Sequence, residues 1–247
     1  MTSPSPPTHR FALLHNKIIL IPTPTAISIP AYRKMYASLH ANPAFCTMAF
    51  GEHFPARVWS DAETHESIHT RDVIRCWGRR GMGDFAVGVY THTNTLSDGT
   101  QDTGRILTPT DQRDNEVRVV DGDAWFDGKF LESITWIGYA GVRDATTTSM
   151  PARESGDAAL PPWEEMVELR YGVVPEYWGK GVAAKAAEMV MLWAVRERGV
   201  RRFIAETERE NVRSGRVLEK MGFVLLSGTE YWKEPSEVEW ERVVLSP

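Results

Sequence analysis

The sequence predicts a mixed α/β or α+β protein in which several strands form one sheet with helices packed against it. Three observations lead to this class. Short apolar runs that suit strands alternate along the chain with longer runs of helical periodicity. The 247 residues, 42% hydrophobic and 25% charged, suit one core with insertions. No internal repeat is present. We therefore expect a disordered Pro/Ser-rich leader at residues 1–10 and a single domain at residues 11–247.

The first half of the chain predicts two helices between strands. The expected elements are strands at 15–24 and 83–92, a helix at 28–43 and a second helix from residue 60. Ser28 is the expected N-cap of the first helix, with Pro30 in its first turn. Ser60 and Glu63 have the capping-box spacing, which places the start of the second helix.

The middle of the chain predicts loops and hairpins around one strand. Residues 92–131 are polar and contain three Asp-Gly pairs, which are typical of hairpin turns. We expect them to form an insertion, in part an accessory ribbon, between the second and third strands. Residues 133–144 then suit a strand, and residues 145–162 suit a mobile loop.

The last third predicts a strand, a long helix and the end of the sheet. The expected elements are strands at 164–174, 201–208, 223–227 and 237–245, a helix from about residue 182 to Gly199, and a helix at 211–223 stopped by Gly222. The C-terminal strand is expected to be a sheet edge that is available for pairing, so an oligomer is possible.

Charge and composition restrict the class of ligand and the compartment. The net charge of −5 argues against general nucleic-acid binding. The window 180–220 nevertheless carries ten Lys or Arg and six Glu, a local excess of +4 that suits a small anionic ligand. Cys46 and Cys76 form no close pair, which favours a reducing compartment. The run at 11–22 is interrupted by polar residues and is too short to span a bilayer, so we expect a cytoplasmic protein without a membrane partner.

Two glycines stand where the strand at 164–174 gives way to the long helix. A strand that turns into a helix through small residues exposes unpaired backbone N–H groups, and the helix dipole adds positive potential there. Gly179 and Gly181 would let the backbone close on a phosphate, with Lys180 adding a longer-range field. The alternative is a plain strand-to-helix connection in which the glycines only allow the backbone to turn tightly.

Two familiar phosphate-binding loops do not match this segment. A P-loop needs four residues between its first Gly and Gly-Lys, followed by Ser or Thr. Here Gly172 is too far from Gly179, and Gly181 follows Lys180. The dinucleotide fingerprint also fails, because Ala184 stands at the position of its third glycine.

The segment "ELRYGVVPEYWGKGVAAKA" followed by "ENVRSGRVLEKMGF" resembles the GCN5-related N-acetyltransferases (GNAT), in particular the RimJ/RimL branch. The resemblance runs from about Glu168 to Phe223. The family loop begins with Gln or Arg, then two variable residues, Gly, one variable residue, and Gly or Ala. Trp178 departs from that first residue. The resemblance implies a GNAT fold and acetyl-CoA as co-substrate, with no metal.

The resemblance also implies how acetyl-CoA is held. Backbone amides of the loop would bind the pyrophosphate, the strand end would pair with the pantetheine arm and offer an N–H as oxyanion donor, and a polar helix start would complete the site. The implied cofactor-binding residues are Val173, Val174, Trp178, Gly179, Lys180, Gly181, Val182, Ala183, Asn211 and Arg216.

Two residues are the implied catalytic groups. Glu168 stands where this branch commonly carries Glu and would help to remove a proton from the attacking amine. The alternative interpretation is that Glu168 has only a structural role, paired for example with Arg170. Many family members use a helix tyrosine as the acid, but that position is Leu218 here, so Ser214 would contact the leaving thiolate. Ser214 could instead bond its own helix backbone. Tyr171 and Tyr231 are further possible donors.

The first half contains a competing motif, His65-Glu66-Ser67-Ile68-His69, which is a literal H-E-x-x-H. On a helix it would place two imidazoles on one face for zinc. Neither the metzincin extension nor a downstream carboxylate follows. His69 also lies on the helix's apolar face, so we interpret it as a core or cleft histidine.

The predicted function is therefore acetyl transfer from acetyl-CoA to a primary amine, a protein N-terminus or a small molecule, by direct attack in a ternary complex. The alternatives are a non-catalytic acyl-CoA-binding module, which Leu218 favours, and a zinc metallopeptidase. The segments 92–131 and 145–162 are expected to border the acceptor cleft. Glu164, Glu165 and Glu168 would favour a cationic acceptor.

Overall fold

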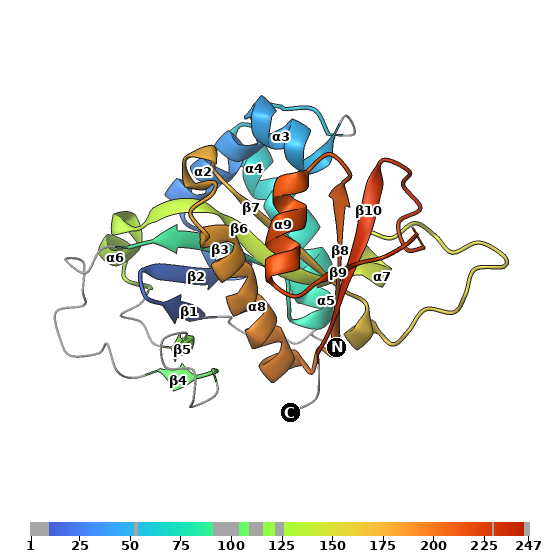
Figure 1. The fold of residues 1–247 in the computed structure, drawn as a ribbon. Helices are drawn as coiled ribbons and strands as arrows, with labels where there is room; N and C mark the ends of the chain where they lie inside the picture. Colours follow the sequence, from blue (N-terminus) through green and yellow to red (C-terminus); the bar gives the residue numbers. More distant parts are fainter. Residues whose placement is uncertain are drawn as a thin grey trace, which may run out of the picture.

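The computed structural model describes residues 10–51, 54–90, 104–108, 116–121, 126–228 and 230–244. Most of the predicted leader lies outside these residues. Within them, ten strands form one sheet in the order β4-β5-β1-β2-β3-β6-β7-β8-β10-β9 (Figure 1). The strands are β1 Phe11–His15, β2 Ile18–Pro22, β3 Asp84–Val89, β4 Arg105–Ile106, β5 Arg118–Asp121, β6 Thr135–Asp144, β7 Val167–Val173, β8 Arg202–Glu208, β9 Val224–Leu225 and β10 Glu237–Val243.

One strand pair gives the sheet its mixed character. Every pairing in the described sheet is antiparallel except that of β7 with β8, which is parallel. These two strands are in register only at Val167–Phe203 and Glu168–Ile204. Beyond Glu168 they diverge. The predicted mixed sheet flanked by helices is confirmed, and the divergence opens the sheet where the predicted site lies.

Helices cover both faces of the sheet. They are α1 Thr23–Ala26, α2 Pro30–His40, α3 Pro43–Phe50, α4 Asp61–Ile68, the π-helix η1 His69–Trp77, α5 Gly78–Arg80, α6 Gly128–Ser133, α7 Ala145–Thr148, α8 Val182–Arg198 and α9 Val212–Lys220, with single 3₁₀ turns η6 Trp163–Glu165 and η7 Pro175–Tyr177.

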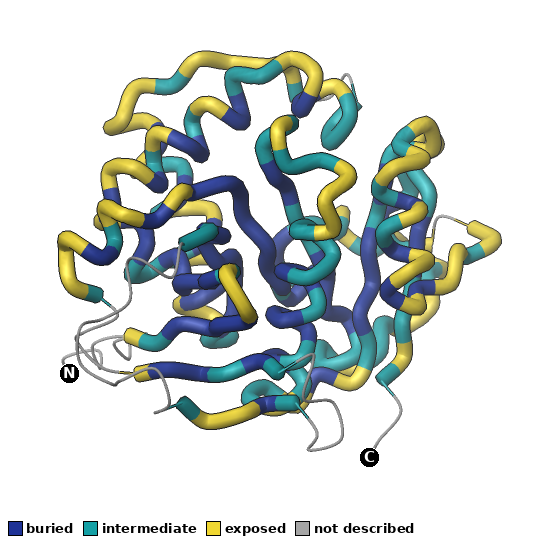
Figure 2. Tube along the Cα trace, turned by 60° about the vertical axis from the view of Figure 1, so that its left-hand side comes forward, coloured by how far each residue is buried: buried dark blue, intermediate teal, exposed yellow. Residues whose placement is uncertain are grey.

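Strand alternation sorts the core into two layers. Leu13 and Leu20 pack with buried residues of α8 such as Trp193. Ile19 and Ile21, their neighbours in sequence, pack on the opposite face with residues of α2 such as Tyr32. Figure 2 shows the buried central strands between exposed outer turns of the helices. Each face therefore has its own apolar layer, and the sheet separates them.

The N-terminal apolar run differs from its prediction as one strand. It forms the β1–β2 hairpin, in which His15 pairs with Ile18. Asn16 adopts a positive φ of 50°, a conformation that Asn tolerates better than most residues. The polar interruption that argued against a signal peptide is therefore a tight turn.

The two predicted inserted segments are described in part. Of residues 92–131, the structure describes 104–108, 116–121 and 126–131. There β4 pairs with β5, and β5 pairs with β1, so a short ribbon extends the sheet beyond its first hairpin. The predicted loop 145–162 begins with the short helix α7. Its mobility stays a prediction.

Helix starts show one correct and one wrong prediction. Ser60 caps α4, and its capping box with Glu63 is complete. Ser28 does not cap α2, since its hydroxyl donates to the Thr25 carbonyl and the helix begins at Pro30 after Ile29. Pro30 sits at N1, where a missing N–H costs no helical bond.

The C-terminal strand is not the sheet edge that was predicted. β10 lies between β8 and β9, so the edge at this end is the two-residue β9. Val224 and Leu225 are both exposed there. Within the described ranges no helix is long and apolar enough to cross a membrane.

Candidate active site

A cavity of about 1140 Å³ opens where β7 and β8 diverge. Strand β7 forms one wall and strand β8 the opposite one. The turn after β7 and the start of α8 close one end, α9 lies along the side, and α3 with the segment before β10 closes the other end. The cavity is thus a consequence of the single parallel pair, whose strands no longer hydrogen-bond to each other past Glu168.

The glycine turn lines the cavity with bare backbone. Gly179 and Gly181 have φ of 73° and 75°, and added β-carbons would meet nothing within 4 Å. Glycine is therefore needed at these two positions because the backbone is left-handed, and not because a side chain would clash. Gly181 is the N-cap of α8 and offers no side chain, and its carbonyl accepts from Lys185 N–H at the first turn of the helix. The N–H groups of residues 182–184 have no partner in the helix, which suits an anion.

Trp178 holds this turn against the end of β7. Its indole N–H donates to the Val173 carbonyl at 2.8 Å, and the Arg213 guanidinium lies 5.3 Å from its ring centroid. The aromatic residue that departs from the family pattern therefore braces the loop. This role could not be predicted from its position alone.

The end of β7 offers one of the two expected backbone donors to the cavity. Val174 N–H donates to the Ile137 carbonyl at 2.8 Å, so it faces β6. Because antiparallel strands alternate the direction of their backbone groups, Val173 directs its N–H toward the diverging β8 side. The expected oxyanion donor is thus Val173, and Val174 is used by the sheet.

The basic residues of α9 face the cavity. Arg213, Arg216 and Lys220 line it, at helical spacings that place them on one side. Lys180 does not line it: its ammonium lies over the Tyr177 ring, 5.0 Å from the centroid, and its side chain is exposed. The side chain of Lys180, which was expected to add a positive field, is therefore outside the lining, whereas the basic residues of α9 belong to it.

Asn211 lines the cavity, but both the oxygen and the nitrogen of its side-chain amide already form hydrogen bonds within the protein. Its Oδ1 accepts from Ser214 N–H at 3.0 Å and caps α9. Its Nδ2 donates to the Met48 carbonyl at 2.8 Å. The side chain therefore fixes α9 against α3, on the wall where the pantetheine arm was expected.

Glu168 lies in the cavity wall as a buried, paired carboxylate. Arg143 donates to both of its oxygens, at 2.6 and 2.9 Å, and the Ser149 hydroxyl donates to Oε2. Burial alone would raise the pKa of Glu168, but the Arg143 charge and these hydrogen bonds lower it below its ordinary value. The pairing partner is thus Arg143 and not the suggested Arg170, whose guanidinium lies 3.6 Å from Asp84.

Ser214 faces the cavity from the first turn of α9 and contacts a tyrosine of β7. The Tyr171 hydroxyl lies 2.8 Å from Ser214 Oγ. Leu218 is buried one turn further along the same helix and also lines the cavity. Tyr231 does not line it, and the Tyr231 hydroxyl accepts from Arg202 at 2.5 Å.

The acidic wall differs from the one expected. Glu164 and Glu165 lie in η6 and do not line the cavity, and Glu165 pairs with Arg201 at 3.1 Å. The cavity's carboxylates besides Glu168 come from the C-terminal third and are Glu206, Glu208, Glu234 and Glu237. Sequence reasoning missed them because their assembly needs β10 to pair with β8. The alternation of "RRFIAETE", which puts 206 and 208 on one face, was the available signal.

Glu206 and Glu237 share a hydrogen bond across the paired strands β8 and β10. Burial raises the pKa of Glu206 strongly, and the charges of Glu168 and Glu237 and the hydrogen bond to Glu237 raise it further. A hydrogen bond between two carboxyl groups contains one proton, so the pair holds one proton and keeps one negative charge. Nearby, Glu208 Oε1 is buried and accepts no hydrogen bond from the residues that the structure describes.

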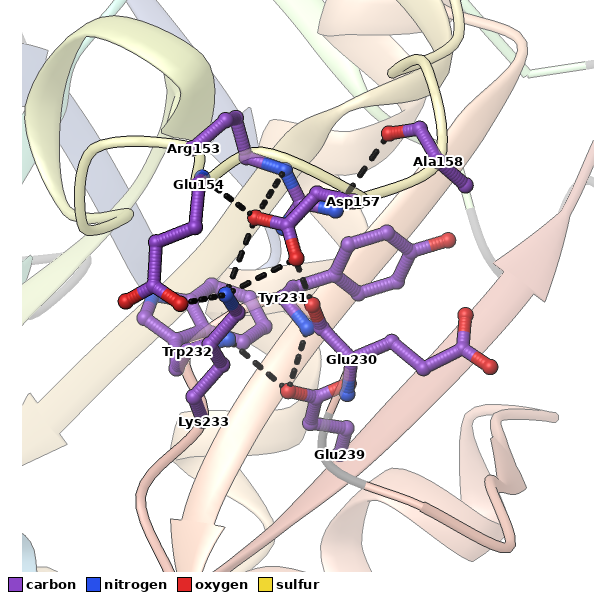
Figure 3. Close-up of polar contacts among 9 residues, drawn as sticks. All are labelled: Arg153, Glu154, Asp157, Ala158, Glu230, Tyr231, Trp232, Lys233 and Glu239. Atoms are coloured by element: carbon purple, nitrogen blue, oxygen red, sulfur yellow. Dashed lines mark hydrogen bonds and ion pairs between the residues drawn. The ribbon is translucent and has the colours of Figure 1, made fainter.

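Two loops that border this acidic end are fastened to each other. Asp157 accepts from Lys233 Nζ at 2.9 Å, and Arg153 donates to the Glu230 carbonyl at 3.0 Å (Figure 3). Below them the buried Glu239 carboxylate accepts three successive backbone N–H groups that begin at Glu230. We call this arrangement the loop clip.

The H-E-x-x-H segment lies away from the cavity. His65 is exposed and His69 half-buried, with ring centroids 6.0 Å apart, and neither lines the cavity. His69 is therefore neither the core nor the cleft residue that was predicted. Within the part of the chain that the structure describes, no group of three or more His, Cys, Asp or Glu is placed to hold a metal.

Comparison with known proteins identifies the family. The family model "Acetyltransferase (GNAT) domain" matches residues 29–224, so the chain belongs to the GNAT acetyltransferases. A curated relative, the uncharacterized N-acetyltransferase YnaD of Bacillus subtilis (strain 168), is 30% identical over 79 residues. That match covers 29% of this chain and 46% of the relative, so this chain matches about half of that protein's length.

Solved structures share the fold at low identity. An acetyltransferase from Agrobacterium tumefaciens str. C58 is 18% identical with a TM-score of 0.52, over 94% of this chain and 93% of that one. RimL, a ribosomal L7/L12 alpha-N-protein acetyltransferase in complex with coenzyme A, is 14% identical with a TM-score of 0.53, over 93% and 96%. AAC(6')-Ib in complex with ribostamycin and coenzyme A is 13% identical with a TM-score of 0.53, over 94% and 93%.

Proposed function

We propose that this protein transfers an acetyl group from acetyl-CoA to a primary amine by direct attack in a ternary complex. One observation carries the proposal. One cavity is lined by the glycine turn before α8, by Ser214 of α9 and by the carboxylates of β7, β8 and β10. Both substrates can therefore occupy one continuous space. Neighbours with CoA, and in one case ribostamycin, support the same function.

The chain's own groups would hold acetyl-CoA as follows. The N–H groups at the start of α8 would bind the pyrophosphate, and Arg213 and Arg216 would add charge. Val173 N–H would donate to the thioester oxygen as negative charge develops there. Acetyl-CoA itself supplies an activated acyl group.

We propose that the carboxylates divide the remaining work. Glu168 stays the predicted base, but its ion pair with Arg143 and its lowered pKa suit a structural anion. The Glu206–Glu237 pair already holds one proton, which its raised pKa retains at neutral pH, and its remaining negative charge faces the cavity as an acceptor for the proton of the amine. Exchange of Glu206→Gln should then lower kcat more than exchange of Glu165→Gln, whose carboxylate pairs with Arg201 outside the cavity lining.

The acidic end of the cavity predicts a cationic acceptor. Glu206, Glu208, Glu234 and Glu237 gather at this end of the cavity, and the two arginines of β6 and β7 that line it, Arg143 and Arg170, already face Glu168 and Asp84. Three five-carbon amines test this, because they differ only at the far end: cadaverine, n-pentylamine and 5-aminopentanoate. We expect kcat/KM to fall in that order. Equal values would contradict a charge-selective acceptor site.

Cofactor binding is tested separately by thermal unfolding with acetyl-CoA, CoA and NAD. A ligand at a hundred times its Kd stabilises the folded state by about 2.7 kcal/mol. We expect acetyl-CoA and CoA to raise Tm and NAD to leave it unchanged. No shift with any of them would refute the proposed function. A shift without transfer to any primary amine would favour the non-catalytic acyl-CoA-binding module.

A further inference from the structure

The contact between Tyr171 and Ser214 joins the two walls of the proposed acetyl-CoA site. Tyr171 lies on β7, two residues before the Val173 N–H that faces the cavity, and Ser214 lies in the first turn of α9. Both side chains line the cavity, and their hydroxyl oxygens are 2.8 Å apart. A thioester whose pantetheine arm runs along the end of β7 would bring its sulfur to this part of the wall.

The direction of the hydrogen bond decides what Ser214 can do. The phenol is the more acidic hydroxyl and hence the better donor, and Tyr171 OH also lies 3.4 Å from the Ser214 carbonyl, which can only accept. Both facts favour Tyr171 as the donor to Ser214 Oγ. Ser214 then keeps its own proton for another acceptor, and a bond received at Oγ strengthens the bond that the same hydroxyl donates.

No other hydroxyl of this helix face reaches the same place. Leu218, one turn after Ser214, cannot donate a hydrogen bond. The start of α9 also contributes positive potential, which favours a developing anion beside Ser214. Burial raises the pKa of Tyr171 to about 12, so its phenol keeps its proton throughout the neutral range.

We propose that Tyr171 is a positioning residue that orients Ser214, so that the serine hydroxyl donates a hydrogen bond to the thiolate of departing CoA. The inference rests on the proposed function. As the amine nitrogen bonds to the acetyl carbon, the C–S bond breaks and its electron pair goes to sulfur. The proton of the amine goes to a carboxylate that lines the acidic end of the cavity. The thiolate leaves as an anion hydrogen-bonded to Ser214 and takes a proton from solvent.

The test measures thiolate stabilisation without any acceptor. Binding of CoA and of desulfo-CoA, which lacks the thiol, is measured by calorimetry from about pH 6 to about pH 9, where the thiol titrates. If the site stabilises the thiolate, the pKa of the CoA thiol is lower in the complex than in solution. CoA affinity relative to desulfo-CoA then rises by about tenfold for each pH unit between those two pKa values.

We expect this rise in the wild-type protein and its loss in both Tyr171→Phe and Ser214→Ala. The double variant should lose no more than either single one, because the tyrosine acts through the serine. Tyr90→Phe is the matched control: it also removes a hydroxyl hydrogen bond, of 2.8 Å to the Asn16 carbonyl, but lies outside the cavity lining. It should keep the wild-type profile.

The outcomes separate this inference from the proposed function. Desulfo-CoA affinity and Tm report whether each variant is folded and binds the nucleotide part. A flat pH profile in the wild type, an unchanged profile in Tyr171→Phe, or additive losses in the double variant would each overturn the inference. Failure of both CoA and desulfo-CoA to bind the wild-type protein would instead overturn the proposed function.

Discussion

At the scale of single residues, the glycine turn shows that a glycine can be needed for its backbone conformation even where a side chain would have room. Gly181 has a positive φ and open surroundings, and so does Gly199 at the other end of α8, with φ of 68°. Alanine at either position meets the same left-handed strain, about 1 kcal/mol. Of these two glycines, only Gly181 lines the cavity.

Gly181→Ala should therefore weaken acetyl-CoA binding at least tenfold, whereas Gly199→Ala should leave it unchanged at a similar loss of stability. The physical reason is that the N–H groups at the start of α8 shift when the turn relaxes. Calorimetric titration and denaturant unfolding check the two effects. Equal loss of binding in both variants would show that α8 stability, and not the turn, governs affinity.

Glu168, which the sequence predicts to be a catalytic residue, forms a buried ion pair that is expected to stabilise the fold. Glu168→Gln would leave the Arg143 guanidinium buried without its counter-ion, and we expect a loss of about 3 kcal/mol in unfolding free energy. The double change Glu168→Gln with Arg143→Met should restore part of it. Urea denaturation measures both. If Glu168→Gln instead unfolds like wild type but loses activity, the catalytic role predicted for Glu168 gains support.

At the scale of elements, β7 presents two different faces to the cavity. Arg170 lies over the ring of Tyr139 in the layer of α2, and Tyr171 packs in the layer of α8, so strand alternation puts Glu168 on the first face and Val173 on the second. Gly172 lies between them, where an added β-carbon would come within 2.8 Å of Phe45. The strand can therefore serve the acceptor with one face and acetyl-CoA with the other.

The loop clip is expected to shape the acceptor end without touching the acetyl-CoA end. Lys233→Met removes the ammonium that bridges Asp157 and Glu154. We expect KM for cadaverine to rise several-fold and KM for acetyl-CoA to stay unchanged, as measured by steady-state kinetics. Arg201→Met, which removes the exposed pair with Glu165, is the control and should change neither. A rise in KM for acetyl-CoA would contradict this division.

At the scale of the whole molecule, the contact of η1 with the start of β3 buries an ionisable group. The π-helix η1 carries Asp72, whose Oδ1 accepts from Asp84 N–H at 2.9 Å, while its Oδ2 is buried with no hydrogen-bond partner among the described residues. Burial, and next the negative charge of Asp84, raise the pKa of Asp72 well above its ordinary value. The folded state therefore favours protonated Asp72.

This raised pKa predicts that stability falls as pH rises. An acid with a raised folded pKa contributes fully below its unfolded pKa, about 3.9, and its contribution is lost as pH climbs toward the folded pKa. Asp72→Asn keeps the Oδ1 acceptor but cannot ionise. As pH rises from about 5 to about 8, the unfolding free energy of Asp72→Asn minus that of the wild type should increase by about 1–3 kcal/mol. Thermal unfolding at both pH values checks this.

Asp61→Asn is the control for that pH series. Asp61 is exposed, and its hydrogen bond and ion pair with Arg33 lower its pKa. It is ionised throughout the range, so its difference from wild type should not change with pH. A constant difference for Asp72→Asn as well would show that Asp72 is already ionised at the lower pH.

The sequence predicted much of the fold because its signals are local. The capping box of Ser60 and Glu63 and the stop at Gly222 depend on a few neighbouring residues, and both are found in the structure. The β1–β2 turn was missed because one Asn-Lys pair is a weak hairpin signal. The π-helix was missed because a change from 3.6-residue periodicity leaves little trace over nine residues.

What the sequence determined by itself was the class of protein and the glycine turn that we propose to bind phosphate. Backbone amides at a helix start need only the local order of strand, glycines and helix, and Gly179 to Ala183 contain that order. Only the tertiary structure decided the partners of each side chain. Arg143 neutralises Glu168, Tyr171 contacts Ser214, and Glu206 meets Glu237, each through strands or helices far apart in the chain. Charge and hydrogen bonding depend on such distances in space, which residue spacing along a chain does not determine.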